Sequence, residues 1–391
     1  HTSPEFRNFI LNNVPFPTVS TDLFFDVQNE KLGSLVAARR AASLTIEATL
    51  GVWEGRWRHA FALVRPPGHH SGCDKCHGFC LINNVGAAVG ALLEKEEEKK
   101  QKQQQQQDVN STEKRTKKRI AIIDIDVHHG DGTQQICDLL NEKQDDEVEI
   151  LFFSLHRYDQ GKFFPQTGHP ESIGKCGLNV NLGFDTFCTP SVLRQMKLDR
   201  LKKQEAEEKQ KHQTPAAENK NDVQEQEKEK EKEVSNSAPP TIEQFPIYKI
   251  ICDETIKIVM DEFLMPLLCQ AFSSSPFSNY PDLTIVSCGF DAAEGDPLGG
   301  QGVTKNGYRY IFEKLSRRMA EKKVEDGDGD ELADQNAATA ERPKVVGVLE
   351  GGYDVEIVSN NFLEVVKTLA GIDDDDDDEE KKMQVPKHFE N

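Results

Sequence analysis

The chain has 391 residues and a formal net charge of −20 at pH 7, from 67 acidic residues against 47 lysines and arginines. This charge disfavours direct binding to nucleic acid and favours basic protein partners. The sequence shows no secretory signal peptide and no apolar run of membrane-spanning length, so we expect no membrane contact and a location in the nucleus or the cytoplasm, or both. The nine cysteines, an odd number, fit these reducing compartments.

Three charged tracts without aromatic residues interrupt the chain, at about 94–118, 201–240 and 322–342. We expect them to be solvated insertions; the second could form a helix, but it has no apolar stripe with which to pack. About 300 residues remain, enough for a single catalytic domain over 1–372. Residues 373–391 begin with acidic residues and are predicted to be a solvated tail. The basic run 114–119 resembles a nuclear localisation signal, but it is interpreted as the end of the first insertion.

The first apolar strand predicted is Phe61–Val64, and it leads into the segment RPPGHH. Two prolines and a glycine stiffen the turn, which presents His69 and His70 at a strand end. Adjacent imidazoles can serve as general base and general acid if each has a carboxylate behind it, and Asp124 and Asp131 are available. A single histidine is more often structural, whereas a pair in a rigid turn favours a catalytic role.

Cys73, Cys76 and Cys80 follow the histidine pair with spacing typical of half a zinc knuckle. No second pair follows at knuckle spacing, so a structural zinc and a redox-sensitive thiol pair are both considered.

The central strand predicted is Arg119–Ile123, an apolar run that suits burial on both faces of a parallel sheet. The segment DIDVHHGDGT follows at its end, where open α/β sheets bind ligands. Asp126 and His128 are two residues apart and point the same way on an extended chain, so they can converge on one divalent cation. Asp124 would point to the same side of the chain as these two residues, but it lies deeper, closer to the strand. A loop that only caps the next helix would need fewer buried ionisable groups.

A third strand is predicted at Val148–His156, followed by an aromatic loop that contains Phe163 and Phe164. Phe79 lies on a comparable turn after the histidine pair. These rings could belong to an ordinary core, or they could wall a narrow slot for a long aliphatic stem.

Two further predicted strands are followed by residues that could bind a metal or donate a hydrogen bond. Leu283–Cys288 leads to Asp291, which only its position at a strand end suggests as a metal ligand. Val345–Leu349 leads to a Gly-Gly pair and Tyr353, whose hydroxyl can donate a hydrogen bond. Because helical stretches at 85–93 and 308–319 alternate with the strands, we expect a parallel α/β sheet with its chemistry along one edge.

Six segments occur in order along the chain: RPPGHH, GFC, DIDVHHGDGT, SLHRYDQGKFFP, GFDAAEGDPLGG and LEGGYD. Together they resemble the zinc-dependent histone deacetylases, class II in type, over about residues 1–370 outside the insertions. The resemblance implies the arginase/deacetylase fold, a three-layer α/β/α domain around a mainly parallel eight-stranded sheet. It also implies that a first strand and a rim loop of the family domain lie upstream of His1.

The resemblance implies a role for each matching residue. The zinc ligands would be Asp126, His128 and Asp291. The catalytic residues would be the base His69, the acid His70, their partners Asp124 and Asp131, and the oxyanion donor Tyr353. The acyl-lysine tunnel would be lined by Gly78, Phe79 and Phe164. A structural potassium ion would lie near Asp124, Asp126, His128, Ser154 and Leu155.

The implied substrates are acetylated lysines of proteins such as histone tails, with regulatory complexes as further partners. In the family, the residue seven positions after the third zinc ligand lies at the tunnel rim, and here it is Leu298, an apolar residue that favours acetyl-lysine peptides over cationic polyamines. A polyamine deacetylase and an acetyl-lysine binding module with weak turnover are the alternatives, although a binding module would be indicated by histidine in place of Tyr353. A binuclear manganese ureohydrolase would need aspartates where Gly130 and Ala293 stand. Asp354 departs from the family, in which asparagine is usual.

Overall fold

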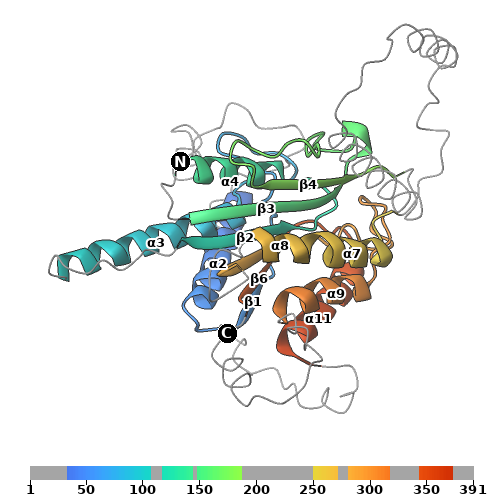
Figure 1. Ribbon diagram of the computed structural model, residues 1–391. Coiled ribbons are helices and arrows are strands. Elements are labelled where there is room, and N and C mark those ends of the chain that lie inside the picture. The colour runs from blue at the N-terminus through green and yellow to red at the C-terminus, as the bar shows by residue number, and fades with distance from the viewer. Residues whose placement is uncertain are drawn as a thin grey trace, which may run out of the picture. The chain divides into compact units, whose positions relative to one another are not determined.

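Figure 1 shows the computed structural model, which describes residues 33–106, 117–143, 148–186, 250–271, 281–317 and 343–372. Apart from Thr186 and Ile250, these residues belong to one compact unit. The strands are β1 (His59–Ala62), β2 (Lys118–Asp124), β3 (Val148–Arg157), β4 (Asn179–Phe184), β5 (Leu283–Cys288) and β6 (Val345–Leu349). They form one parallel sheet in the order β1-β6-β5-β2-β3-β4.

The register of the sheet brings the strand ends to one edge. Asp124, the last residue of β2, is aligned with Ser154 of β3 and with Ser287 of β5. Ser287 is in turn aligned with Val348 of β6. Because neighbouring strands are parallel, the polar segments that follow β2, β5 and β6 meet beyond the same edge.

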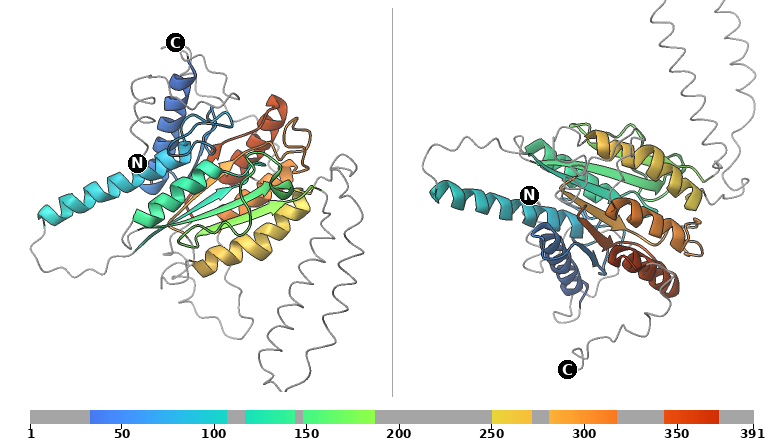
Figure 2. Two further views of the ribbon diagram at one scale, coloured as in Figure 1. Left: turned by 90° about the horizontal axis from the view of Figure 1, so that it is seen from above. Right: turned by 60° about the horizontal axis from the view of Figure 1, so that its bottom comes forward.

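Helices cover both faces of the sheet, and Figure 2 shows those coloured blue to green and those coloured yellow to red as separate layers. One face packs on α2 (Ser34–Trp53), α3 (Asn84–Gln106) and α4 (Asp131–Lys143). The other packs on α7 (Asp253–Val259), α8 (Met265–Ala271), α9 (Lys305–Ser316) and α11 (Val355–Ala370). A π-helix, Met260–Leu264, joins α7 to α8, and the short 3-10 helix Asp159–Gly161 follows β3.

The apolar residues of β2 explain the two layers. Ile120 and Ile122 enter the core beneath α2 and α3, whereas Ala121 and Ile123 enter the core beneath α7 and α9. All four are essentially inaccessible to solvent, which is why the strand has no polar alternation.

Helix α3 extends to Gln106, well into the tract predicted as the first insertion. Glutamate, lysine and glutamine favour helix, and Glu96 is paired with Lys99 at 2.7 Å on the same helix. Glu96 also accepts a hydrogen bond from the Trp53 indole at 2.9 Å, which ties α3 to α2. Residues 107–116, 201–240, 322–342 and 373–391 lie outside the described residues, so the insertions and the tail stay predictions.

The predicted three-layer α/β/α fold is confirmed, and all five predicted strands are present, although the first covers His59–Ala62 instead of Phe61–Val64. The described residues contain six strands, against the eight that the resemblance implies. The unpredicted strand, β4, lies at an edge of the sheet and is only partly buried, so its sequence NVNLGF lacks a continuous apolar signal. No helix among the described residues combines the length and apolarity that crossing a bilayer requires.

Candidate active site

Asp126, His128 and Asp291 form a compact cluster just beyond the ends of β2 and β5. The Nδ1 atom of His128 lies 3.0 Å from an oxygen of Asp126 and 3.0 Å from an oxygen of Asp291. One ligand atom from each residue lies within 4.8 Å of the other two. The structure thus brings together the three residues predicted as metal ligands, although Asp291 is 163 residues from His128 in sequence.

Backbone groups that follow two strands, β2 and β6, hold the two carboxylates of this cluster. The N–H of Gly351 donates to Asp126 at 2.8 Å, and the N–H of Val127 donates to Asp291 at 2.9 Å. A Cβ atom at position 351 would collide with both carboxylates. Glycine is required there because the segment after β6 passes directly against the cluster.

The electrostatics of the cluster favour a cation. Both carboxylates are fully buried, and burial together with the charge of Asp126 raises the pKa of Asp291 to about 7. Burial also acts on Asp126, but His69 and His128 outweigh it and hold the pKa of that carboxyl well below its usual range. Two buried carboxylates repel each other unless they share a positive ion. Two carboxylate oxygens and one imidazole nitrogen suit a zinc ion that keeps an open position.

His69 and His70 lie beside the cluster, each with its own carboxylate. Nδ1 of His69 is 3.0 Å from Asp124, and Nδ1 of His70 is 2.9 Å from Asp131. Burial lowers the pKa of His69, but the carboxylates of Asp126 and Asp124 outweigh it and raise that pKa well above the usual value. Burial and the charge of His69 lower the pKa of His70 to about 3. The two imidazoles therefore differ strongly in their affinity for a proton.

Glu350 is a site residue that the sequence analysis did not assign. Its fully buried carboxylate accepts hydrogen bonds from the N–H groups of Gly68 at 2.7 Å and His69 at 3.1 Å, and from the Ser287 hydroxyl at 3.1 Å. Burial raises its pKa to about 7. Glu350 thereby fixes the histidine turn against β5 and β6. Its position directly after a strand, at the same edge, is the signal that could have identified it.

Aromatic rings surround the histidines. The Phe163 ring stacks on His128 with centroids 5.0 Å apart, and the Phe164 ring meets His70 edge-on at 5.1 Å. Gly78 has a φ of 53°, and a Cβ atom there would collide with the His70 ring. The side chains of Phe164 and Phe79 remain 41% and 43% exposed. These two rings therefore present apolar surface beside the histidine pair.

Tyr353 is held by a carboxylate that the sequence analysis also missed. Its N–H donates to Asp296 at 2.8 Å, and the other oxygen of Asp296 accepts from the N–H of Leu298 at 2.9 Å. Burial raises the pKa of the Tyr353 hydroxyl, and the carboxylates of Asp291 and Asp126 add to this effect. The hydroxyl is therefore neutral and can donate a hydrogen bond. Asp296 lies within a loop, so no pattern in the sequence pointed to it.

Asp354, the departure noted in the sequence, caps α11. Its side chain accepts hydrogen bonds from the N–H groups of Glu356 at 3.0 Å and Ile357 at 2.9 Å. An aspartate is well suited to a helix N-cap.

The residues predicted to bind potassium come close together on neighbouring strands. Asp124 and Ser154 are aligned across β2 and β3, and both are fully buried, as is nearly all of Leu155. The potassium site itself stays a prediction.

The cysteine cluster has mixed surroundings. Cys76 and Cys80 are buried, and burial raises the pKa of the Cys76 thiol to about 12. Such thiols are poor nucleophiles, which disfavours the redox alternative. Neither group of three potential metal ligands found in the described residues contains a cysteine, so the geometry gives no support to a structural zinc there.

Comparison with known proteins gives one consistent family. Residues 26–369 match the model of the histone deacetylase domain. Histone deacetylase 4 of Caenorhabditis elegans is 31% identical over 91% of this chain and 28% of its own length. Histone deacetylase 15 of Arabidopsis thaliana is 28% identical over 86% of this chain and 40% of its own length. The chain thus spans less than half the length of these two relatives.

A solved structure supports the same assignment. The chain in the crystal structure of the HDA15 HD domain has 26% sequence identity to this chain and matches it with a TM-score of 0.57. The match covers 95% of this chain and 70% of that one. The family predicted from the six sequence segments is confirmed, and the chain belongs to the histone deacetylase domain family.

Proposed function

We propose that the protein is a zinc-dependent hydrolase that removes acetyl groups from lysine side chains of proteins such as histones, releasing acetate and leaving the lysine side chain with a free amine. The main support for this proposal is that two imidazole–carboxylate pairs lie beside one cluster of three potential metal ligands. Nε2 of His69 lies 3.8 Å from Asp126, so the base faces the ligands that would hold the metal. Membership of the histone deacetylase domain family supports the same reaction.

Each residue of the site would have its own role in amide hydrolysis. Asp126, His128 and Asp291 would hold zinc, which when bound polarises an amide carbonyl and acidifies water. Asp124 orients His69 through Nδ1, and zinc bound to Asp126 would offset the carboxylate charge that raises the His69 pKa, so that Nε2 could accept the proton of the attacking water. Asp131 likewise orients His70, and its negative charge favours the protonated imidazole against burial and the charge of His69, so that His70 would protonate the departing amine. The neutral hydroxyl of Tyr353 would donate to the developing oxyanion.

The rim favours a peptide substrate. The exposed rings of Phe79 and Phe164 offer apolar surface to the four methylene groups of a lysine side chain. Leu298 is 49% exposed and carries no charge, so it gives no advantage to the distal ammonium group of a polyamine. The presence of Tyr353 argues against a module that only binds acetyl-lysine. The physiological substrate, regulatory partners, nuclear or cytoplasmic location and potassium dependence stay predictions.

The test is a turnover assay of the zinc-loaded protein on a panel of acyl-lysine peptides and on acetylspermidine. We expect acetate release from acetyl-lysine peptides that a chelator abolishes and added zinc restores. Binding of these peptides without acetate release would instead indicate a binding module. Turnover confined to acetylspermidine would indicate a polyamine deacetylase.

A further inference from the structure

A third histidine lies against the outer imidazole–carboxylate pair. Nε2 of His77 is 2.9 Å from one oxygen of Asp131, and Nδ1 of His70 is 2.9 Å from the other. The rings of His70 and His77 have centroids 5.5 Å apart. One ligand atom from each of the three residues lies within 4.8 Å of the other two. The hydrolytic reaction proposed above uses His70 and Asp131 but leaves His77 without a role.

The Nε2 atom of His77 is at ion-pair distance from Asp131 but outside hydrogen-bond geometry. It is buried and finds no hydrogen-bond partner within the described residues. Buried polar atoms in folded proteins are nearly always paired. A cation shared by the imidazole and the carboxylate would satisfy both groups.

The donor set is typical of a transition-metal site. Two imidazole nitrogens and one carboxylate oxygen suit Zn²⁺, and in a tetrahedral zinc site neighbouring ligand atoms are about 3.4 Å apart. Small side-chain rotations suffice to reach that spacing. Burial raises the pKa of Asp131, but the imidazoles of His70 and His77 outweigh it and keep the pKa well below its usual range. The carboxylate is therefore ionised and available to a cation.

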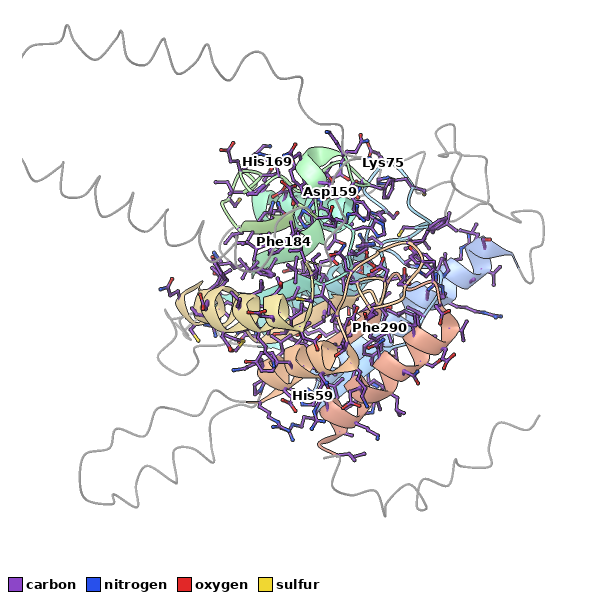
Figure 3. The ribbon with its side chains drawn as sticks, turned by 90° about the vertical axis from the view of Figure 1, so that its right-hand side faces the viewer. His59, Lys75, Asp159, His169, Phe184 and Phe290 are labelled. Carbon is purple, nitrogen blue, oxygen red and sulfur yellow. The ribbon has the colours of Figure 1, made fainter. Side chains whose placement is uncertain are left out.

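An ion can reach this group from solvent. The side chains of His77 and Asp131 are each 11% exposed, whereas in the inner cluster His128 is 12% exposed and Asp126 and Asp291 are fully buried. Figure 3 labels Lys75 at the top of the molecule, on the loop between His70 and His77. Its ammonium group is 3.7 Å from Asp131, and its side chain is 55% exposed. This positive charge opposes a metal ion at the same carboxylate, so the site should be weaker than the buried cluster.

We propose that His70, His77 and Asp131 form a second site for a divalent transition metal such as Zn²⁺, and that its occupation inhibits turnover. Inhibition follows because His70, when it coordinates a metal ion together with Asp131, can no longer donate a proton to the leaving amine. This inhibitory consequence rests on the function proposed above, whereas metal binding at the site does not.

The binding test is equilibrium dialysis of the metal-free full chain against Zn²⁺, with metal analysis of the protein. We expect two zinc ions per wild-type chain, the second bound more weakly. His77→Ala should retain only the first, and Asp291→Ala only the second. His169→Ala, which removes an exposed histidine 4.0 Å from Glu171, should retain both and serves as the matched control.

Lys75→Met sharpens the test, because removal of the ammonium charge should tighten the second site by on the order of tenfold. The proposal is overturned if the wild type binds one zinc, if His77→Ala still binds two, or if Cys73→Ser rather than His77→Ala removes the second ion. None of these readouts depends on catalysis, so they separate this site from the proposed deacetylase function.

The inhibition test compares acetate release at ten equivalents of zinc with release at one equivalent. We expect a fall of fivefold or more in the wild type and no fall in His77→Ala, each measured against its own rate at one equivalent. Equal inhibition of both proteins would contradict the regulatory role.

Discussion

The inner and outer parts of the site are built in different ways. The inner carboxylates of Asp126, Asp291 and Glu350 are fully buried and accept hydrogen bonds from backbone groups at strand ends. The outer residues Phe164 and Leu298 lie on loops and are 41% and 49% exposed. The sheet therefore fixes the chemistry, whereas the loops can vary specificity at little cost in stability.

Loss of an inner ligand should have the largest effect. We expect Asp291→Ala to lower zinc affinity at the buried cluster by more than about 100-fold, beyond the usual cost of losing an outer partner of a ligand, and to abolish turnover. The measurements are the affinity of the tighter zinc site, by titration of the metal-free protein, and acetate release with one equivalent of zinc present. Asp74→Ala removes an exposed carboxylate and should change neither. If Asp291→Ala keeps wild-type affinity, Asp291 is not a ligand.

Tyr353 lies between the two parts, and its hydroxyl should matter only to catalysis. We expect Tyr353→Phe to lower kcat by about 10²–10³, on the order of 3 kcal/mol, because one oxyanion donor is lost. Binding of a hydroxamate should persist, since the zinc ligands and the histidine pair are intact. A kcat within a few-fold of the wild type would mean that another group stabilises the oxyanion.

Substitution of Glu350 tests whether the inner part of the site also stabilises the folded protein. Glu350→Ala should lower the free energy of unfolding by roughly 3 kcal/mol, because two buried N–H groups and one hydroxyl lose their acceptor. Glu350→Gln retains one acceptor oxygen and should cost less. Urea denaturation of each variant in the same zinc state measures the change.

The matched control for this experiment is Glu171→Ala, because the Glu171 side chain is 91% exposed. Its effect should stay within about 0.5 kcal/mol. If Glu350→Ala is equally mild, the buried carboxylate is not what holds the histidine turn.

Leu298 should show the smallest effect, mainly on specificity. A carboxylate about 4 Å from an ammonium group contributes on the order of 1 kcal/mol in water and about 4 kcal/mol at an effective dielectric constant of 20. Leu298→Glu should therefore shift the ratio of kcat/KM for acetylspermidine to that for an acetyl-lysine peptide by about tenfold. An unchanged ratio, or a wild type that already prefers the polyamine, would remove Leu298 from the determinants of specificity.

The sequence predicted the fold well where the signal was local. Strands such as Arg119–Ile123 are continuous apolar runs, and parallel pairing places their ends at one edge. Edge strand β4 was missed because it is only partly buried and its buried residues are Asn179 and Asn181. The extent of α3 was missed because its charged tract was interpreted as a solvated insertion.

The site was less predictable, because its contacts join distant segments. Asp126 and His128 could be inferred from their spacing, whereas Asp291 and Tyr353 were suggested only by their positions after strands and took their specific roles from the family resemblance. Glu350 contacts Gly68 across 282 residues, so no local pattern could reveal that hydrogen bond. His77 is adjacent to a recognised segment, yet its approach to Asp131 depends on how the loop folds.

The hydrogen bonds of Asp296 have a consequence for protein engineering. One oxygen of this side chain holds the N–H of Tyr353, and the other holds the N–H of Leu298. A larger or charged residue at position 298 that displaces this backbone will also displace the tyrosine. Selection for a new substrate at position 298 therefore acts on reaction rate as well, and mutant libraries should leave Asp296 unchanged while they vary Phe79 and Phe164.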